Sequence, residues 1–175
     1  PTTMKENFAP WGWPQEEPSW TWDVPNGRLM EVRVFSKTPL IRLYLNDSLI
    51  AEQKKSAHSI ITNFKVPYST GSLRAVAVID DKVEDQVVLE TTTEAHHLSL
   101  EADRTALKTA SEVLSYIKIS LLDQEGRRLL NDQRLVEISV EGTGELVALG
   151  NANPREPQNF SDHKTHLFKG RCLAI

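Results

Sequence analysis

Alternation of apolar and polar side chains at every second residue is the feature of this sequence that most constrains its fold. Met30, Val32 and Val34 would point to one side of an extended chain, and the residues between them to the other. The same pattern recurs over residues 41–45, after which Asn46-Asp47 offers a turn into another apolar run and so predicts a β-hairpin. Period two is the signature of a strand with one buried face, so the chain is predicted to be built from strands.

Further predicted strands cover the rest of the chain. They span residues 60–66, 73–79, 83–90, 98–102, 116–122, 136–141, 145–149 and 170–175. Two sets of apolar residues in the second half should each share one face, namely Ile117, Ile119 and Leu121, and Val136, Ile138 and Val140. Short strands separated by turn signals are typical of β-sandwiches. The predicted fold class is therefore all-β, with two immunoglobulin-like β-sandwich domains in tandem.

A polar stretch over residues 91–97 interrupts the strands and marks the predicted boundary between domains 1–93 and 94–175. Residues 102–116 have apolar residues at helical spacing, at Leu107, Ala110 and Leu114. We nevertheless predict an extended or irregular segment there, because strongly β sequence follows it and context often overrides helix propensity.

The composition argues against two classes of partner. Lys and Arg number 20 against 24 Asp and Glu, so the formal charge is −4 and no basic stripe is available to follow a phosphate backbone. No apolar run approaches the roughly 20 residues of a membrane-spanning helix, and the first residues lack the apolar core of a secretion signal. We therefore expect no secretion signal in this sequence and no nucleic acid or membrane among its partners.

An ordered series of motifs makes the first half similar to a known domain. The series is Trp11-Gly12-Trp13-Pro14, Trp20-Thr21-Trp22, the run over residues 32–46, and Phe64-Lys65-Val66-Pro67-Tyr68 followed by Gly71. This half resembles the domain of unassigned function that follows the catalytic barrel in bacterial glycoside hydrolase family 2 enzymes of the β-galactosidase type.

The second half is similar to the terminal domain of the same enzymes. The motifs are Ala102-Asp103-Arg104, Gly142-Thr143-Gly144-Glu145-Leu146, Gly150-Asn151-Ala152-Asn153-Pro154, Phe160 and Gly170-Arg171-Cys172-Leu173-Ala174-Ile175. Ala152-Asn153 stands where that family usually has glycine-aspartate, and Asn46-Asp47 stands where it usually has Asn-Gly. Together the two resemblances cover nearly the whole chain.

The resemblance implies a chain without catalytic residues. The family hydrolyses β-galactosides with retention, using two glutamates on a (β/α)₈ barrel, and such a barrel alone takes about 250 residues. This chain has 175 residues, and none of its matching positions is a catalytic one. We predict a structural and interaction module whose partners are the catalytic barrel and other domains of a periplasmic or extracellular parent. One alternative is a carbohydrate-binding module that binds oligosaccharide. The other is a fragment of a surface or adhesin protein built from tandem immunoglobulin-like domains.

The tryptophans are the candidate contact residues of the chain. Trp11, Trp13, Trp20 and Trp22 are its four tryptophans, and we predict that they contact another domain or a carbohydrate. Four indoles would present roughly 600 to 1000 Å², more than the roughly 300 to 600 Å² of the largest apolar patch on a typical monomer. We therefore favour packing against protein over a sugar-binding platform.

No metal, cofactor or catalytic residue is predicted. Asp162, His163 and His166, or the pair His96 and His97, could be drawn as metal ligands, but no further strong ligand is evident and we predict exposed loop histidines. Cys172 is the single cysteine, so no internal disulfide can form. Its apolar neighbours predict a buried structural thiol.

Overall fold

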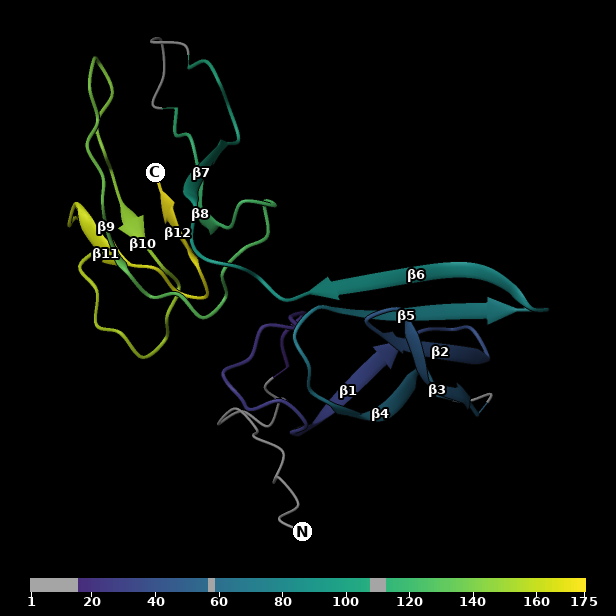
Figure 1. Cartoon of the computed structure of the whole chain (residues 1–175). Helices are drawn as coiled ribbons and strands as arrows, with labels where there is room; N and C mark the ends of the chain where they lie inside the picture. The colour runs from purple at the N-terminus through teal and green to yellow at the C-terminus, as the bar shows by residue number, and fades with distance from the viewer. Residues whose placement is uncertain (1–15, 57–58, 108–112) are drawn as a thin grey trace. The chain divides into compact units, whose positions relative to one another are not determined.

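The computed structural model describes residues 16–56, 59–107 and 113–175, and its strands all pair antiparallel (Figure 1). The chain divides into two compact units, Pro1–Thr91 and Thr92–Ile175, so residues 92 and 93, which we assigned to the first domain, fall in the second unit. Each unit has one four-stranded and one two-stranded sheet among its described residues, where no α-helix occurs. The predicted fold class, all-β with two immunoglobulin-like sandwiches in tandem, is confirmed.

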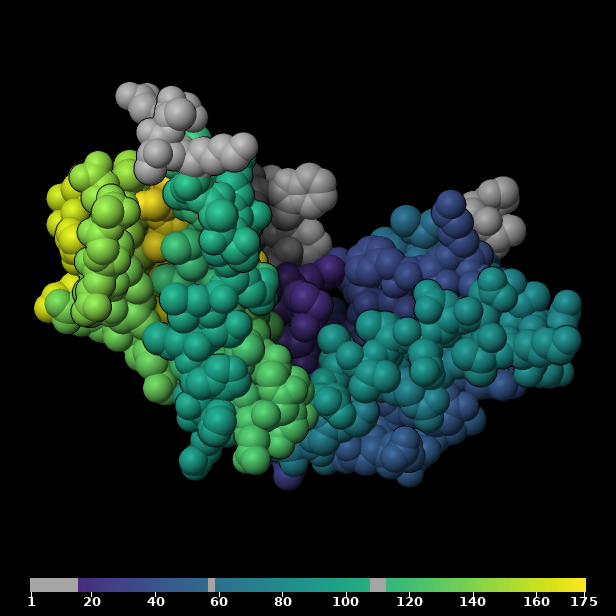
Figure 2. Space-filling model, turned by 90° about the horizontal axis from the view of Figure 1, so that it is seen from above, coloured from purple at the N-terminus to yellow at the C-terminus, as the bar shows by residue number. Residues whose placement is uncertain are grey.

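Unit 1 is made of six strands, of which β2 and β4 bury alternate residues as predicted. They are β1 (Leu29–Phe35), β2 (Leu40–Leu45), β3 (Ser48–Lys54), β4 (Ile61–Pro67), β5 (Ser72–Ile79) and β6 (Lys82–Glu90). One sheet has the order β3-β2-β5-β6 and the other pairs β1 with β4. β6 lies at the edge of its sheet, and all of its residues except Leu89 are exposed (Figure 2).

The core of unit 1 takes one face of each sheet. Ile41 of β2 lies opposite Ala77 of β5, and both side chains are buried. Val66 of β4 is also fully buried, and its partner Met30 packs against the same cluster. Phe35, at the end of β1, points outward and is exposed, as the alternation predicts.

Two hairpin turns of unit 1 use left-handed backbone without glycine. Asn46 and Asp47 have φ values of 48° and 63°, and Asp80 and Asp81 have 48° and 60°. Two successive residues with positive φ make the type I′ turn that matches the twist of a hairpin, and Asn and Asp tolerate this region better than other residues with side chains. The Asn46 side chain also accepts a hydrogen bond from the Ser72 backbone N–H at 2.8 Å. This hairpin therefore has two residues with positive φ at the position where the family that the chain resembles usually has Asn-Gly.

Unit 2 has shorter strands. They are β7 (His97–Ala102), β8 (Ile117–Leu122), β9 (Leu135–Glu137), β10 (Leu149–Gly150), β11 (Lys164–His166) and β12 (Arg171–Ala174). One sheet has the order β10-β12-β8-β7, and the other pairs β11 with β9. Ile119, Leu121, Val136, Leu149 and Leu167 form much of the core.

Several predictions for unit 2 were wrong. The strand predicted over residues 136–141 ends at Glu137, and Val140, predicted to share a face with Val136 and Ile138, is exposed whereas those two contact the core. The strand predicted over residues 145–149 is only β10, which begins at Leu149, and β11 was not predicted. Residues 103–107 and 113–116 are irregular, as predicted, and the remainder of that segment lies outside the described residues.

Cys172 is buried in the core of unit 2, which confirms the predicted structural thiol. It lies on β12 opposite Ile119 of β8 and is 3% exposed. Burial raises the pKa of this thiol to about 11. A thiol that stays protonated and covered is not a nucleophile at neutral pH.

Candidate functional site

Trp20 lies in the core of unit 1. It is 2% exposed, and its indole Nε1–H donates a hydrogen bond to the backbone oxygen of Ser69 at 2.8 Å. Its ring packs against that of Tyr68, with 5.2 Å between the centroids and a tilt of 54°. The backbone oxygen of Trp20 accepts a hydrogen bond from the Thr91 hydroxyl at 3.0 Å. The segment that carries Trp20 is therefore tied to unit 1 by its side chain and its backbone.

Trp22 is half-buried against the same cluster. Its Nε1–H donates to the backbone oxygen of Ser19 at 3.1 Å, and its backbone N–H donates to the Tyr68 hydroxyl at 3.3 Å. Trp11 and Trp13 lie outside the described residues. That these tryptophans contact another domain or a carbohydrate stays a prediction.

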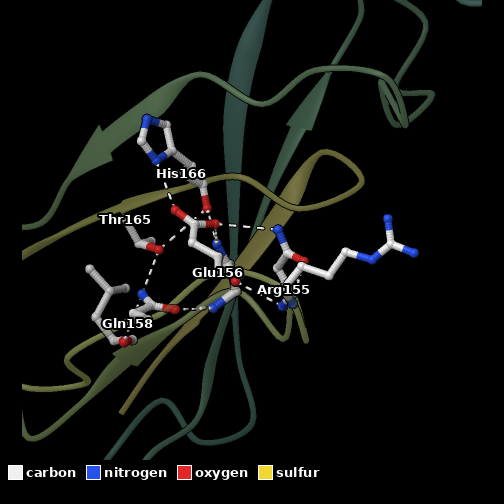
Figure 3. Close-up of polar contacts among 8 residues, drawn as sticks. Arg155, Glu156, Gln158, Thr165 and His166 are labelled. Carbon is white, nitrogen blue, oxygen red and sulfur yellow. Dashed lines mark hydrogen bonds and ion pairs between the residues drawn. The ribbon is translucent and has the colours of Figure 1, made fainter.

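A polar cluster around the buried side chain of Asn151 holds the loop that follows β10. The side-chain Nδ2 of Asn151, a residue only 4% exposed, donates to Oε2 of Glu156 at 2.8 Å and to the backbone oxygen of His166 at 2.9 Å. Its Oδ1 accepts a hydrogen bond from the Asn153 backbone N–H at 2.8 Å. The side chains of Glu156 and His166 turn toward each other in this cluster, whereas Arg155 extends away from it (Figure 3). Asn151 thus uses both amide hydrogens and its oxygen, as a buried amide must.

Glu156 is held ionised by this cluster. The hydrogen bond from Asn151 is the main reason that the pKa of the Glu156 carboxyl lies below its usual range, and the hydrogen bond with His166 is the second. Its Oε1 lies 3.0 Å from Nδ1 of His166. Gln158 completes the cluster by donating to the buried Thr165 hydroxyl at 2.5 Å. These contacts hold the loop against β11 (Figure 3).

Ala152 shows that the loop keeps a demanding backbone shape. Its φ is 60°, in the left-handed region that glycine adopts most easily, and it is exposed. In this chain a residue with a Cβ atom adopts that strained conformation. Such a conformation persists only where the surrounding contacts enforce it, and Asn151 and Asn153 supply those contacts.

A fully buried carboxylate, that of Asp123, lies at the turn after β8. Asp123 is fully buried and accepts hydrogen bonds from the backbone N–H groups of Thr93, Glu125 and Arg127 at 3.1, 3.1 and 2.8 Å. The Arg127 guanidinium adds an ion pair at 2.8 Å. Burial by itself raises the pKa of Asp123, but the hydrogen bonds from Arg127 and Thr93 outweigh it and hold that pKa below its usual range. Asp123 therefore fixes the start of unit 2 to the turn over residues 123–127.

Sequence reasoning missed Asp123, Glu156 and Gln158. A signal for Asp123 was present, because an aspartate three residues before Gly126 is typical of a side chain that caps its own turn. Glu156 and Gln158 have partners on another strand, and local sequence carries no signal for those.

The candidate metal ligands are exposed side chains. His97 and His166 belong to strands rather than the predicted loops, and His166 is paired with Glu156. The Nδ1 atoms of His96 and His97 lie 3.0 Å apart, a hydrogen-bond distance at which one ring donates and the other accepts, and the ring centroids are 5.2 Å apart. In the described ranges, no three His, Cys, Asp or Glu side chains come together as a metal site would require. The described residues also contain no helix with the length and apolar character to cross a bilayer.

Comparison with known proteins matches each half of the chain to a family model. Residues 98–175 match the glycoside hydrolase family 2 C-terminal domain 5 family, and residues 27–84 match a domain of unknown function (DUF4982). The predicted resemblance to the C-terminal accessory domains of family 2 glycoside hydrolases is confirmed.

Two curated relatives match 90% and 81% of this chain. The chain is 23% identical over 158 residues to BoGH2A, a β-galactosidase of Bacteroides ovatus, and this alignment covers 90% of the chain. It is 26% identical over 145 residues to a β-glucuronidase of Formosa agariphila. A solved family 2 glycosyl hydrolase of Bacteroides cellulosilyticus is 29% identical, with a TM-score of 0.89 over 94% of the chain. The chain spans only 18% and 14% of the two curated relatives, and 21% of the solved one.

Proposed function

We propose that the chain is a non-catalytic structural and interaction module of a family 2 glycoside hydrolase. The observation that carries this proposal is the combination of high coverage of the chain and low coverage of its relatives. BoGH2A aligns with 90% of the chain, but the alignment takes up only 18% of BoGH2A. A (β/α)₈ barrel needs about 250 residues, so the aligned region is too short to contain one.

The electrostatics of the carboxyl groups support a non-catalytic role. A retaining hydrolase needs one carboxyl with a raised pKa as general acid, about 5 Å from a second one that attacks the sugar. In the described part of the chain, the carboxyl groups with a shifted pKa are Asp103, Asp123, Asp132 and Glu156, and all four are shifted downward. Each of these carboxylates accepts hydrogen bonds from groups of its own unit. A carboxylate held in this way stabilises a turn or loop and is not suited to donate a proton.

The module is proposed to present rigid loops to the rest of the parent enzyme. Asn151 and Glu156 fix the loop after β10, and Asp123 fixes the turn after β8. Loops held by buried side chains can keep their shape when another domain packs on them. The parent enzyme would hydrolyse β-galactosides, because the relative that aligns with 90% of the chain is named a β-galactosidase. The relative named a β-glucuronidase makes β-glucuronides the alternative substrates.

The test of the non-catalytic role is hydrolysis by the purified chain. We expect no release of nitrophenol from nitrophenyl β-galactoside or β-glucuronide above the rate of a matched Glu156→Gln preparation. Activity that co-purifies with the chain and is lost in a variant of one of its own carboxylates would overturn the proposal.

The parent's substrate needs the full-length enzyme. We expect its kcat/KM to be higher for nitrophenyl β-galactoside than for the β-glucuronide. The opposite preference would replace the galactoside assignment and leave the non-catalytic role of this chain intact.

A further inference from the structure

Asn26 and Gly27 form an exposed turn just before β1. Gly27 has a φ of 83°, and no atom lies within 4 Å of the place where a side-chain carbon would stand. Because glycine has no side chain, its backbone nitrogen can approach the side-chain amide of the preceding residue without hindrance. Both residues are exposed, so water reaches the amide carbon of Asn26.

We propose that Asn26 is a site of spontaneous deamidation, gated by one backbone hydrogen bond. The Gly27 backbone nitrogen attacks Cγ of Asn26. The new N–Cγ bond forms as the Cγ–Nδ2 bond breaks, and ammonia leaves with the proton that the Gly27 nitrogen gives up. Water then opens the cyclic imide at either carbonyl and leaves aspartate or isoaspartate. The reaction uses no oxidant, reductant or cofactor.

The gate is the hydrogen bond from the Gly27 N–H to the backbone oxygen of Tyr68, at 2.8 Å. The Tyr68 N–H in turn donates to the backbone oxygen of Arg28 at 2.8 Å. These two bonds extend the β1–β4 ladder beyond the pair formed by Leu29 and Pro67. The Gly27 nitrogen cannot attack while its proton is held by Tyr68, so deamidation in the folded chain waits for this end of the ladder to open.

The products should differ in their effect on unit 1. Both add one negative charge, but isoaspartate also adds one atom to the main chain between Val24, which packs on the core, and β1. The longer connection cannot keep the Gly27 N–H opposite Tyr68 without shifting Val24 or the strand. Aspartate leaves the main chain unchanged, so an Asn26→Asp variant reproduces the charge without the extra atom.

The experiment incubates the full chain at mildly alkaline pH, folded and in urea, and follows conversion of Asn26 by peptide mass spectrometry. Asn26→Gln serves as the matched control, because the longer side chain would have to close a larger and slower-forming ring. Hydrogen exchange of the Gly27 amide is measured in the same folded sample. We expect conversion at Asn26 in urea, slowed in the folded chain by about 2- to 12-fold, the factor that the net free energy of one hydrogen bond implies. The exchange protection of Gly27 should match that factor.

Two results would overturn the proposal. Absence of conversion at Asn26 in the unfolded chain would remove the site. Equal rates in folded and unfolded chains, or a Gly27 amide that exchanges without protection, would remove the gate. If the extra main-chain atom of isoaspartate disturbs unit 1, the isoaspartate form should unfold at a lower urea concentration than the Asn26→Asp variant. Equal unfolding midpoints would contradict this effect of the extra atom.

Discussion

Replacement of Trp20 by alanine tests whether the tryptophan segment is part of the core of unit 1. The side chain is 2% exposed, contacts Tyr68 and donates one hydrogen bond to Ser69. Deleting a large aromatic side chain from a core costs about 3 to 5 kcal/mol. We therefore expect the free energy of unfolding of unit 1 to fall by about that amount in Trp20→Ala.

Two further variants divide this cost into its parts. Trp20→Phe keeps an aromatic ring but removes the donor to the partly buried Ser69 oxygen, and a typical hydrogen bond contributes a net stabilisation of about 0.5 to 1.5 kcal/mol. Trp22→Ala is the matched control, because that side chain is half-buried against the same cluster. It should forfeit only part of the roughly 1.5 to 3 kcal/mol gained by full burial of a large apolar side chain.

The measurement is urea unfolding followed by far-ultraviolet circular dichroism, which does not depend on the fluorescence of the tryptophan removed. Binding of a galactoside is measured for the same variants. If the Trp20→Ala variant is as stable as the unsubstituted chain, Trp20 does not pack in the core of unit 1. Loss of saccharide binding at unchanged stability would instead favour the carbohydrate-binding alternative.

Three further predictions concern unit 2. Ala152→Gly should raise stability by about 0.5 to 1 kcal/mol in urea titrations, because relief of left-handed strain exceeds the extra freedom of glycine in the unfolded chain; a loss of stability would contradict this. Because the folded-state pKa of Asp123 is lowered, its contribution is present above its unfolded pKa of about 3.9 and lost as pH falls through the folded value. Asp123→Asn should therefore flatten the acid limb of the stability curve, and an unchanged limb would exclude the effect. Cys172, with a pKa of about 11 and 3% exposure, should resist a thiol reagent at pH 8 until urea unfolds unit 2, and fast labelling of folded protein would disprove its burial.

The strands of unit 1 could be predicted because β2 and β4 bury alternate residues and β5 carries a continuous apolar run. β2 and β5 are paired over six residues, so the buried face of each strand carries enough apolar residues to be recognised from local sequence. The turn pairs at Asn46 and Asp80 also carried their own signal. Local pattern and tertiary pairing agree in this unit.

In unit 2 the pairing partner, and not the local pattern, sets where a strand ends. β9 stops after three residues because its partner β11 is three residues long, although apolar alternation continues to Val140. β11 itself escaped prediction because the residue it buries is Thr165, whose hydroxyl is satisfied by Gln158. A buried polar side chain with a distant partner leaves no period-two signal.

The candidate site was predicted only in part for the same reason. Asn151 was singled out through a family resemblance, but nothing in that resemblance indicated its partners, Glu156 in the same loop and His166 on β11. The spacing of the tryptophans did not distinguish a core position such as that of Trp20 from a ligand platform.

The most direct test of the central claim is the sequence of the coding region that precedes Pro1. If this chain is an accessory module of a family 2 glycoside hydrolase, that region should encode alternating strands and helices over about 250 residues, with two glutamates at the carboxyl ends of strands. An upstream region made of further immunoglobulin-like repeats, with no such barrel, would contradict the account and favour a surface or adhesin protein.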